Sequence, residues 1–123
     1  MGRHTNARRC VVDGIKFDSR AEAARYAELA ALKKTGRVTE LEVHPHFDLR
    51  GANGGLAGRG YTADFAYRLD GTRTIVEDVK GRRFRDWPLR RDLFADNYRS
   101  YEFYEVRVVR GHFEAKRILP REG

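Results

Sequence analysis

The stretch from Tyr61 to Lys80, YTADFAYRLDGTRTIVEDVK, decides the fold expected for this chain. Its two halves, Tyr61–Leu69 and Thr72–Lys80, are rich in aromatic and β-branched residues, which favours strands. Between them, Asp70-Gly71 is a dipeptide that favours a tight hairpin turn. We therefore expect a pair of antiparallel strands near the centre of the fold.

Two acids and a lysine are expected to meet where these strands pair. Side chains alternate along a strand, so Asp78 and Lys80 share one face while Glu77 and Val79 occupy the other. Asp64 comes from the neighbouring strand, in an apolar context. This set of groups is suited to hold a divalent cation and a water beside a phosphodiester. The alternative is an exposed ion pair of Asp78 with Lys80, which contributes at most about 1 kcal/mol.

An alanine-rich segment before the hairpin is expected to form a helix. Ser19 and Glu22 have the Ser-x-x-Glu spacing of a capping box, and the run continues to Lys34 before Gly36 ends it. Its small apolar residues form a narrow stripe that predicts close packing of the helix against a sheet. These residues are Ala24, Ala27, Ala31 and Leu32.

The remaining segments complete the expected order of elements. Val38–Leu49 favours a strand that is interrupted at Pro45, and a second helix is expected to begin at Asp86 or Trp87. Glu102–Arg110 and Phe113–Leu119 favour two further strands. The fold class predicted is α/β, with a mixed central sheet flanked by helices.

Two segments are expected to lack regular structure within this single domain of residues 1–123. Residues 1–10 are predicted to be a flexible basic N-terminus. Residues 50–60 are too rich in glycine for a helix or a strand and are expected to form a mobile loop. Arg50 and Arg59 in this loop suggest a basic flap over a nucleic acid, and a plain hairpin tip is the alternative.

The composition favours a basic protein that meets phosphate. The net charge is +7 in 123 residues, and arginine supplies most of the cations. Guanidinium groups bind phosphate oxygens in bidentate fashion, although a soluble basic surface explains the charge as well. Cys10 is the single cysteine, which excludes an internal disulfide. No apolar run approaches the roughly 18–20 residues of a membrane helix, so we expect a cytoplasmic protein and no membrane partner.

The order of elements and motifs resembles the PD-(D/E)XK nuclease superfamily. The core of that superfamily is a helix, three antiparallel strands, a helix and a strand. An acid on its second core strand precedes an acid-x-Lys on the third, and Asp64 and Asp78-Val79-Lys80 match these two motifs. The proline that usually precedes the first acid is absent, and Ala63 stands in its place. The resemblance implies a restriction-endonuclease-like core.

Three motifs look more narrowly like a phage-encoded family of small endonuclease-like proteins. That family is often described as Holliday-junction-resolvase-like, and a similar layout opens the catalytic domain of the Tn7-type transposon endonuclease. The resemblance spans about Val11 to Val109, nearly the whole chain. The motifs that carry it are Phe17–Glu22, Tyr61–Phe65 and Glu77–Gly81.

The resemblance also implies roles for individual residues. Asp64 and Asp78 would bind Mg²⁺, or Mn²⁺ in its place, and the carbonyl of Val79 is a further candidate ligand. Lys80 would orient or help deprotonate the attacking water. Glu22 matches the glutamate that related resolvases place on the first helix to complete the metal site. A capping-box glutamate is also explained by helix energetics alone.

Basic residues around this site are expected to hold the DNA backbone. The candidates are Arg50, Arg59, Arg82, Arg83, Arg85, Arg90 and Arg91. Arginine is a poor proton acceptor, so Arg90 and Arg91 are assigned to binding, with a solvated helix face as the alternative. His44 and His46 are only a weak indication of zinc, and they are interpreted as polar strand positions near the cleft.

The sequence therefore predicts a metal-dependent DNA endonuclease. By resemblance the substrate is branched or junction DNA, and a homodimer is expected because junction resolution needs paired incisions. Two other classes of function stay open. One is a non-catalytic DNA-binding module that keeps the fold, and the other is a structural phage protein whose charge pairs only stabilise a sheet.

Overall fold

The structure is a computed structural model that describes residues 9–51, 56–79 and 87–121, with the side chains of residues 56–59 excepted. Its helices are α1 (Arg20–Lys34) and α2 (Trp87–Asn97). Its strands are β1 (Cys10–Val12), β2 (Ile15–Phe17), β3 (Val38–Val43), β4 (His46–Arg50), β5 (Leu56–Thr62), β6 (Phe65–Leu69), β7 (Arg73–Val79), β8 (Glu102–Val109) and β9 (His112–Leu119).

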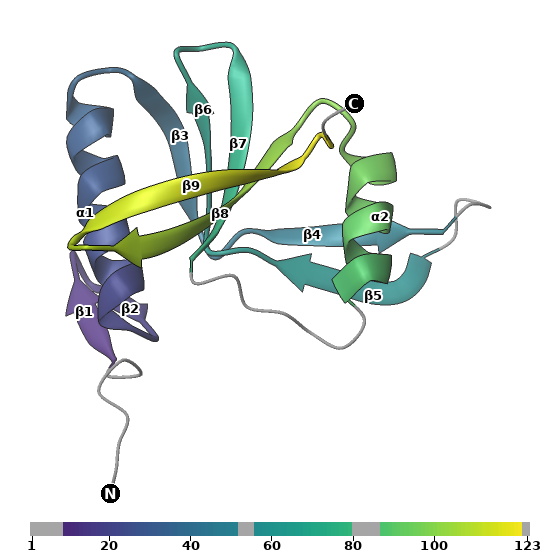
Figure 1. Ribbon diagram of the computed structural model, residues 1–123, viewed down its shortest axis with the longest axis horizontal. Coiled ribbons are helices and arrows are strands. Elements are labelled where there is room, and N and C mark those ends of the chain that lie inside the picture. The colour runs from purple at the N-terminus through teal and green to yellow at the C-terminus, as the bar shows by residue number, and fades with distance from the viewer. Residues whose placement is uncertain (1–8, 52–55, 80–86, 122–123) are drawn as a thin grey trace, which may run out of the picture.

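A mixed five-stranded sheet in the order β3-β6-β7-β8-β9 forms the centre of the molecule (Figure 1). β6 runs antiparallel to both of its neighbours, β3 and β7. β8 runs parallel to β7, and β9 returns antiparallel to β8. The parallel pair requires a crossover, and α2 lies on it between β7 and β8. The prediction of an α/β fold with a mixed sheet flanked by helices is confirmed.

The hairpin expected around Asp70-Gly71 is also confirmed. β6 and β7 pair antiparallel through the register Phe65↔Glu77 to Leu69↔Arg73. At the turn, Asp70 and Gly71 have φ values of 52° and 75°, in the left-handed region that Gly and Asp tolerate.

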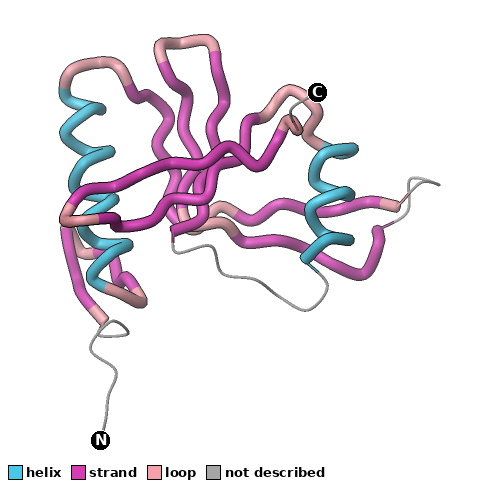
Figure 2. The backbone as a smooth tube through the Cα atoms, in the orientation of Figure 1, coloured by secondary structure: helices cyan, strands magenta, loops and turns pink. Residues whose placement is uncertain are grey.

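Each face of the sheet buries its own apolar core. α1 and the β1–β2 hairpin cover one face, and α2 together with the β4–β5 pair covers the other (Figures 1 and 2). The core on the α1 side contains Phe17, Leu29, Val38, Phe65, Tyr67, Ile75, Val79 and Val106. The core on the α2 side contains Phe47, Leu49, Tyr61, Ala66, Val76, Trp87, Phe94 and Phe103.

The first helix has the predicted ends but buries a different face. Ser19 is the N-cap and its Oγ accepts a hydrogen bond of 3.1 Å from the Glu22 N–H. The buried helix residues are Glu22, Ala23 and Leu29, whereas the predicted stripe is wrong because Ala24, Ala27 and Ala31 are exposed. The helix turns polar side chains inward, since the sheet presents buried polar partners to them.

Two segments that were predicted as single strands are each broken into two. Val38–Leu49 divides into β3 and β4, and Tyr61–Leu69 divides into β5 and β6. β3 and β6 belong to the central sheet, whereas β4 and β5 pair only with each other and leave it as a second, two-stranded sheet (Figure 1). The two breaks lie side by side, so the paired strands fork at one point.

The fork is held by backbone hydrogen bonds across the breaks. The His44 N–H donates to the Asp64 carbonyl at 3.0 Å, and the Ala63 N–H donates to the Pro45 carbonyl at 3.0 Å. Pro45 has no N–H for a continuous ladder, and His44 has a left-handed φ of 56°. These two residues turn the chain out of the central sheet.

The glycine-rich segment is more ordered than expected where the structure describes it. A mobile loop over residues 50–60 is contradicted by β5, which begins at Leu56 and pairs with β4. A Cβ at Gly60 would collide with the ring of His46, so that exposed side chain would have to move aside. Residues 52–55 lie outside the described part of the chain.

The N-terminal part of the described chain begins with a short hairpin. β1 and β2 turn at Asp13-Gly14 and pair in the register Cys10↔Phe17 to Val12↔Ile15. Residues 1–8, which include most of the predicted flexible terminus, lie outside the described part. Neither described helix has the length and apolar character to cross a membrane.

Candidate functional site

Asp64 lies at the fork, in the break between β5 and β6, and not within a continuous strand. Its Oδ2 accepts a hydrogen bond of 2.6 Å from the Val79 N–H. Its own N–H donates to the Glu77 carbonyl at 3.1 Å, and its side chain is buried with the residue 4% exposed. The carboxylate is therefore fixed beside the end of β7, where that strand leaves the sheet.

Glu22 and His44 meet Asp64 at this point. Glu22 lies in the first turn of α1 and is buried, with 3% of its surface exposed. His44 Nε2 lies 3.4 Å from Glu22 Oε1. One possible ligand atom from each of Glu22, His44 and Asp64 lies within 4.8 Å of the other two. The structure thus brings together two of the predicted site residues, Glu22 and Asp64, and adds a histidine.

The electrostatics of this cluster favour a cation. Burial and then the nearby charge of Asp64 raise the pKa of Glu22, while His44 acts in the opposite direction. Two buried carboxylates this close together disfavour each other's charged forms. A positive ion between them would offset that repulsion and their lost hydration.

A pocket of about 520 Å³ opens beside the cluster. Arg90 reaches it from α2 and donates a hydrogen bond to the Gly60 carbonyl. A guanidinium and a buried carboxylate therefore line the same cavity, which is a combination suited to an anionic substrate held near a cation. The lining residues are Asp18, His44, Gly60, Thr62, Ala63, Asp64 and Arg90.

The second predicted acid lies on β7 next to this group. Asp78 is buried, with 6% of its surface exposed, and it precedes Val79, whose N–H contacts Asp64. Within the described residues, the group whose possible metal-ligand atoms lie within 4.8 Å of one another consists of Glu22, His44 and Asp64. Asp78 is not part of that group. Lys80 lies outside the described part of the chain.

Glu77, the other acid of the pair on β7, is bound on the opposite face. Arg25 Nε donates to Glu77 Oε1 at 2.8 Å and Arg25 Nη2 donates to Oε2 at 2.6 Å. The Tyr67 hydroxyl also donates to Oε2. Burial and then Glu77 raise the pKa of Tyr67, so the tyrosine remains a donor. Both oxygens of Glu77 are engaged in this buried network under α1.

Of the predicted DNA-binding arginines, the structure describes Arg50, Arg90 and Arg91 with their side chains. Arg90 lines the pocket, whereas Arg91 Nε contacts Asp92 Oδ1 at 3.3 Å. Arg50 is exposed at the end of β4, and the side-chain amide of Asn97 bonds both its N–H and its carbonyl at 3.1 Å. The side chain of Arg59 lies outside the described part, as do Arg82, Arg83 and Arg85.

His44 and Asp18 are the site residues that sequence reasoning did not assign to the site. His44 was interpreted as a polar strand position near the cleft, but it lies in the break after β3 with 38% of its side chain exposed. The available signal was the His-Pro dipeptide inside an extended segment, which disfavours a continuous central strand. Asp18 directly precedes the N-cap Ser19, and no feature of the sequence around it indicates that it lies beside the site.

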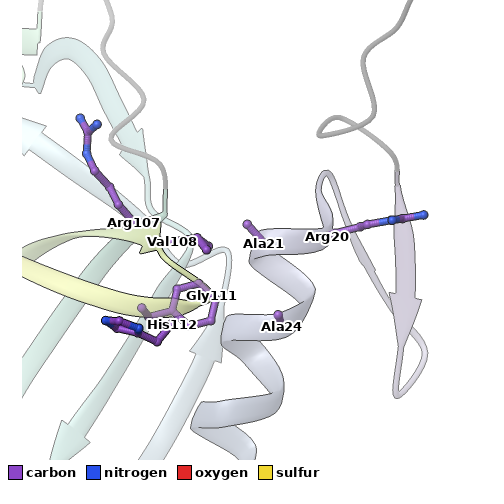
Figure 3. A pocket seen from close by; sticks show the side chains of 8 residues that line it. Arg20, Ala21, Ala24, Arg107, Val108, Gly111 and His112 are labelled. Atoms are coloured by element: carbon purple, nitrogen blue, oxygen red, sulfur yellow. The ribbon is translucent and has the colours of Figure 1, made fainter.

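A larger cavity of about 700 Å³ lies elsewhere, between the start of α1 and the turn that joins β8 to β9 (Figure 3). Ala21 and Ala24 line it from the helix, and Arg20 and Arg107 extend to opposite sides of it (Figure 3). The residues that line it include no carboxylate, so this cavity has no metal-binding acids.

Comparisons with known proteins show the family of this chain. No curated protein matches it. A solved structure titled "Crystal structure of SSO0001" is similar over 80% of this chain and 52% of that one, with 13% identity and a TM-score of 0.38. This chain therefore spans about half the length of that protein. The family described as "Protein of unknown function (DUF1064)" matches residues 3–112, and the chain belongs to that family.

Proposed function

We propose that this protein is a metal-dependent DNA endonuclease whose active site is the fork between the central sheet and the β4–β5 pair. The observation that carries the proposal is the meeting of Glu22, His44 and Asp64 within 4.8 Å of one another, in a pocket that Arg90 also lines. Glu77, in contrast, has both carboxylate oxygens occupied by Arg25.

The order of elements supports a restriction-endonuclease-like core. A helix, α1, precedes three antiparallel neighbours, β3, β6 and β7, and α2 then leads to β8, which is parallel to β7. This is the order that the PD-(D/E)XK resemblance implies. Asp64 directly precedes the second of these strands, and Asp78 and Val79 end the third, with Lys80 next in the sequence.

The residues at the fork fit a divalent cation. Carboxylate oxygens are the ligands that Mg²⁺ and Mn²⁺ take in proteins, and Glu22 and Asp64 supply them from two directions. Asp78 would complete the acidic set through its own carboxylate, and the Val79 carbonyl is a further candidate ligand. When bound, the cation would polarise a phosphoryl oxygen and offset the charge of the transition state.

The remaining residues would position the substrate and the water. Lys80 would orient the attacking water and help to remove its proton. Arg90 would contact a phosphate oxygen from the wall of the pocket formed by α2. The exposed Arg50, together with Arg59, Arg82, Arg83, Arg85 and Arg91, would hold the backbone of the nucleic acid.

Branched DNA is the substrate class we propose, on the resemblance to the small resolvase-like endonucleases. A four-way junction presents two strands for cutting, so a homodimer with one active site in each chain would make both incisions. A cytoplasmic location remains part of this proposal.

A cleavage panel tests the proposal. Labelled four-way junctions, flaps, single strands and linear duplexes are incubated with the protein in Mg²⁺, in Mn²⁺ and in a chelator. The variants are Asp64→Asn, Asp78→Asn and Lys80→Met. Asp70→Asn is the matched control, because it makes the same chemical change at an exposed turn where asparagine is equally suited to the left-handed backbone.

We expect metal-dependent cutting that each site variant reduces at least about a thousand-fold, because each loses transition-state stabilisation, while Asp70→Asn stays active. Cutting that persists in Asp64→Asn and Asp78→Asn contradicts the site. DNA binding that falls steeply with salt, without cleavage in any metal, identifies the non-catalytic binding module instead. Absence of both binding and cleavage favours a structural protein.

A further inference from the structure

We propose that His44 is a direct metal ligand and makes the site at the fork prefer a first-row transition-metal ion, such as Mn²⁺, over Mg²⁺. The inference rests on the proposed function only in taking Glu22 and Asp64 as metal ligands. It does not require that the protein cleaves DNA.

The geometry places the imidazole in the ligand set. His44 Nε2 lies 3.4 Å from Glu22 Oε1, and the ligand atoms of Glu22, His44 and Asp64 all lie within 4.8 Å of one another. Two atoms bound to one such ion at about 2.1–2.2 Å lie at most about 4.4 Å apart. The set is therefore close to the spacing that three ligands of one ion require, and side-chain rotation would bring the three atoms onto it.

The position of the ring is fixed by the backbone. The His44 N–H donates to the Asp64 carbonyl at 3.0 Å, so the main chains of the two residues are joined at the fork. The left-handed φ of 56° turns the His44 side chain out of the β3 ladder. Its ring lies 6.0 Å from the ring of Phe17, which bounds it on the α1 side. The histidine also lines the pocket, so an ion there is reached from solvent.

The chemistry of a mixed ligand set decides the preferred ion. Imidazole nitrogen is a favourable ligand for transition metals, whereas Mg²⁺ takes oxygen ligands and keeps much of its water. Two carboxylates alone would not separate Mg²⁺ from Mn²⁺ strongly. A nitrogen ligand raises the affinity for Mn²⁺, and raises it further for Co²⁺ and Zn²⁺ along the usual order of divalent ions.

The test measures metal binding directly on the full chain. Titration calorimetry with Mn²⁺ and with Mg²⁺ is performed on the wild type, His44→Asn and His46→Asn. Asparagine tolerates a left-handed backbone, so His44→Asn removes the imidazole without straining the turn. His46 is the matched control because it is an exposed histidine two residues away that contacts Thr62 and Asp48 and lies outside the ligand set.

We expect Mn²⁺ to bind the wild type at least about ten-fold more tightly than Mg²⁺. His44→Asn should lose about 10–100-fold in Mn²⁺ affinity and less than about three-fold in Mg²⁺ affinity, and His46→Asn should match the wild type. Pulsed electron paramagnetic resonance of bound Mn²⁺ should show coupling to an imidazole nitrogen that disappears in His44→Asn.

Two results would overturn the inference. If His44→Asn binds Mn²⁺ as the wild type does, His44 is not a ligand. If it loses equal affinity for Mn²⁺ and Mg²⁺ without a change in nitrogen coupling, His44 only positions Glu22. Circular dichroism establishes that each variant is folded. Because binding is measured without DNA, a protein that binds Mn²⁺ through His44 and cuts nothing contradicts the proposed function and leaves this inference intact.

Discussion

Helix α1 directs two charged side chains into the molecule, Arg25 and Glu22. Arg25 meets a group of opposite charge, and Glu22 meets a group of the same charge. Arg25 reaches Glu77, and the carboxylate receives two hydrogen bonds from the guanidinium and one from Tyr67. Glu22, three residues earlier, is brought beside a second acid, Asp64. The positive charge of Arg25 balances that of Glu77, whereas the pKa of Glu22 is raised by burial and by its acidic neighbour.

The contrast distinguishes an acid that stabilises the fold, Glu77, from acids that are suited to bind a cation, Glu22 and Asp64. A buried carboxylate with a bidentate arginine has no need of a further partner. Two buried carboxylates beside a pocket retain electrostatic free energy that an added cation would release. The same helix therefore anchors the fold with Arg25 and presents Glu22 to the candidate site.

The largest expected effect comes from breaking the compensated pair. Arg25→Met leaves the carboxylate of Glu77 buried without its cation, and we expect the free energy of unfolding to fall by about 3–5 kcal/mol. Denaturant titration followed by circular dichroism measures the change. Adding Glu77→Gln removes the charge but leaves an acceptor for Tyr67, so the double variant should recover a large part of the loss. A loss below about 1 kcal/mol in Arg25→Met would show that this pair behaves like a surface pair.

The second prediction concerns Glu22, where we expect a substitution to raise the free energy of unfolding and not to lower it. Glu22→Gln removes one of two adjacent carboxylates and keeps a side chain that suits a capping box. We expect the metal-free protein to be stabilised by about 1 kcal/mol, measured by the same titration, while metal binding is lost. Destabilisation by a similar amount would show that Glu22 is compensated as fully as Glu77, and the contrast between them would disappear.

The third prediction concerns the cap that positions Glu22. Ser19 is buried and its Oγ holds the Glu22 N–H at 3.1 Å. Ser19→Ala should reduce the free energy of unfolding by about 1 kcal/mol, and Ser19→Gly by only a few tenths, because glycine suits the cap position better than alanine. Metal titration of both variants then reports whether the start of α1 must be fixed for Glu22 to act. Equal stability of the two variants would contradict the role of the cap.

The sequence predicted the elements well because their signals are local. The capping box at Ser19 and the turn at Asp70-Gly71 follow from neighbouring residues, and the structure has both at those places. The buried face of α1 was mispredicted because it contains Glu22 and Arg25. Their burial depends on partners about 40 to 50 residues away in the chain, at Asp64 and Glu77, and a helical pattern of apolar residues does not show them.

The candidate site was predicted in part for the same reason. Asp64 and Glu22 were chosen as site residues from motifs, and the structure brings them together. The fork was not predicted, since it requires two breaks in separate segments to lie side by side. His44 lies in the candidate ligand set only because of that fork. Its dipeptide with Pro45 indicates a break in the strand but not which residues lie opposite the break.

The smallest expected effect comes from a second arginine, glutamate and tyrosine group with similar chemistry at the surface. Arg73 Nε and Nη2 donate to the two oxygens of Glu102 at 2.7 Å, and the Tyr104 hydroxyl donates to Glu102 at 2.8 Å. The side chain of Arg73 is 48% exposed, whereas that of Arg25 is 15% exposed. If burial is what separates the two groups, Arg73→Met should lower the free energy of unfolding far less than Arg25→Met does.

The pH dependence of stability tests separately whether the charges of Arg73 and Glu102 stabilise the fold. The hydrogen bond from Arg73 is the main cause that lowers the pKa of Glu102 from 4.5 to about 2. The unfolded chain therefore takes up the proton first as the pH falls, so the contribution of the pair is complete above about pH 4.5 and is lost between there and about pH 2. The difference in unfolding free energy between the wild type and Arg73→Met should shrink across that window. A difference that stays constant down to pH 2 would mean that Arg73 stabilises the protein through the packing of its aliphatic stem and not through its charge.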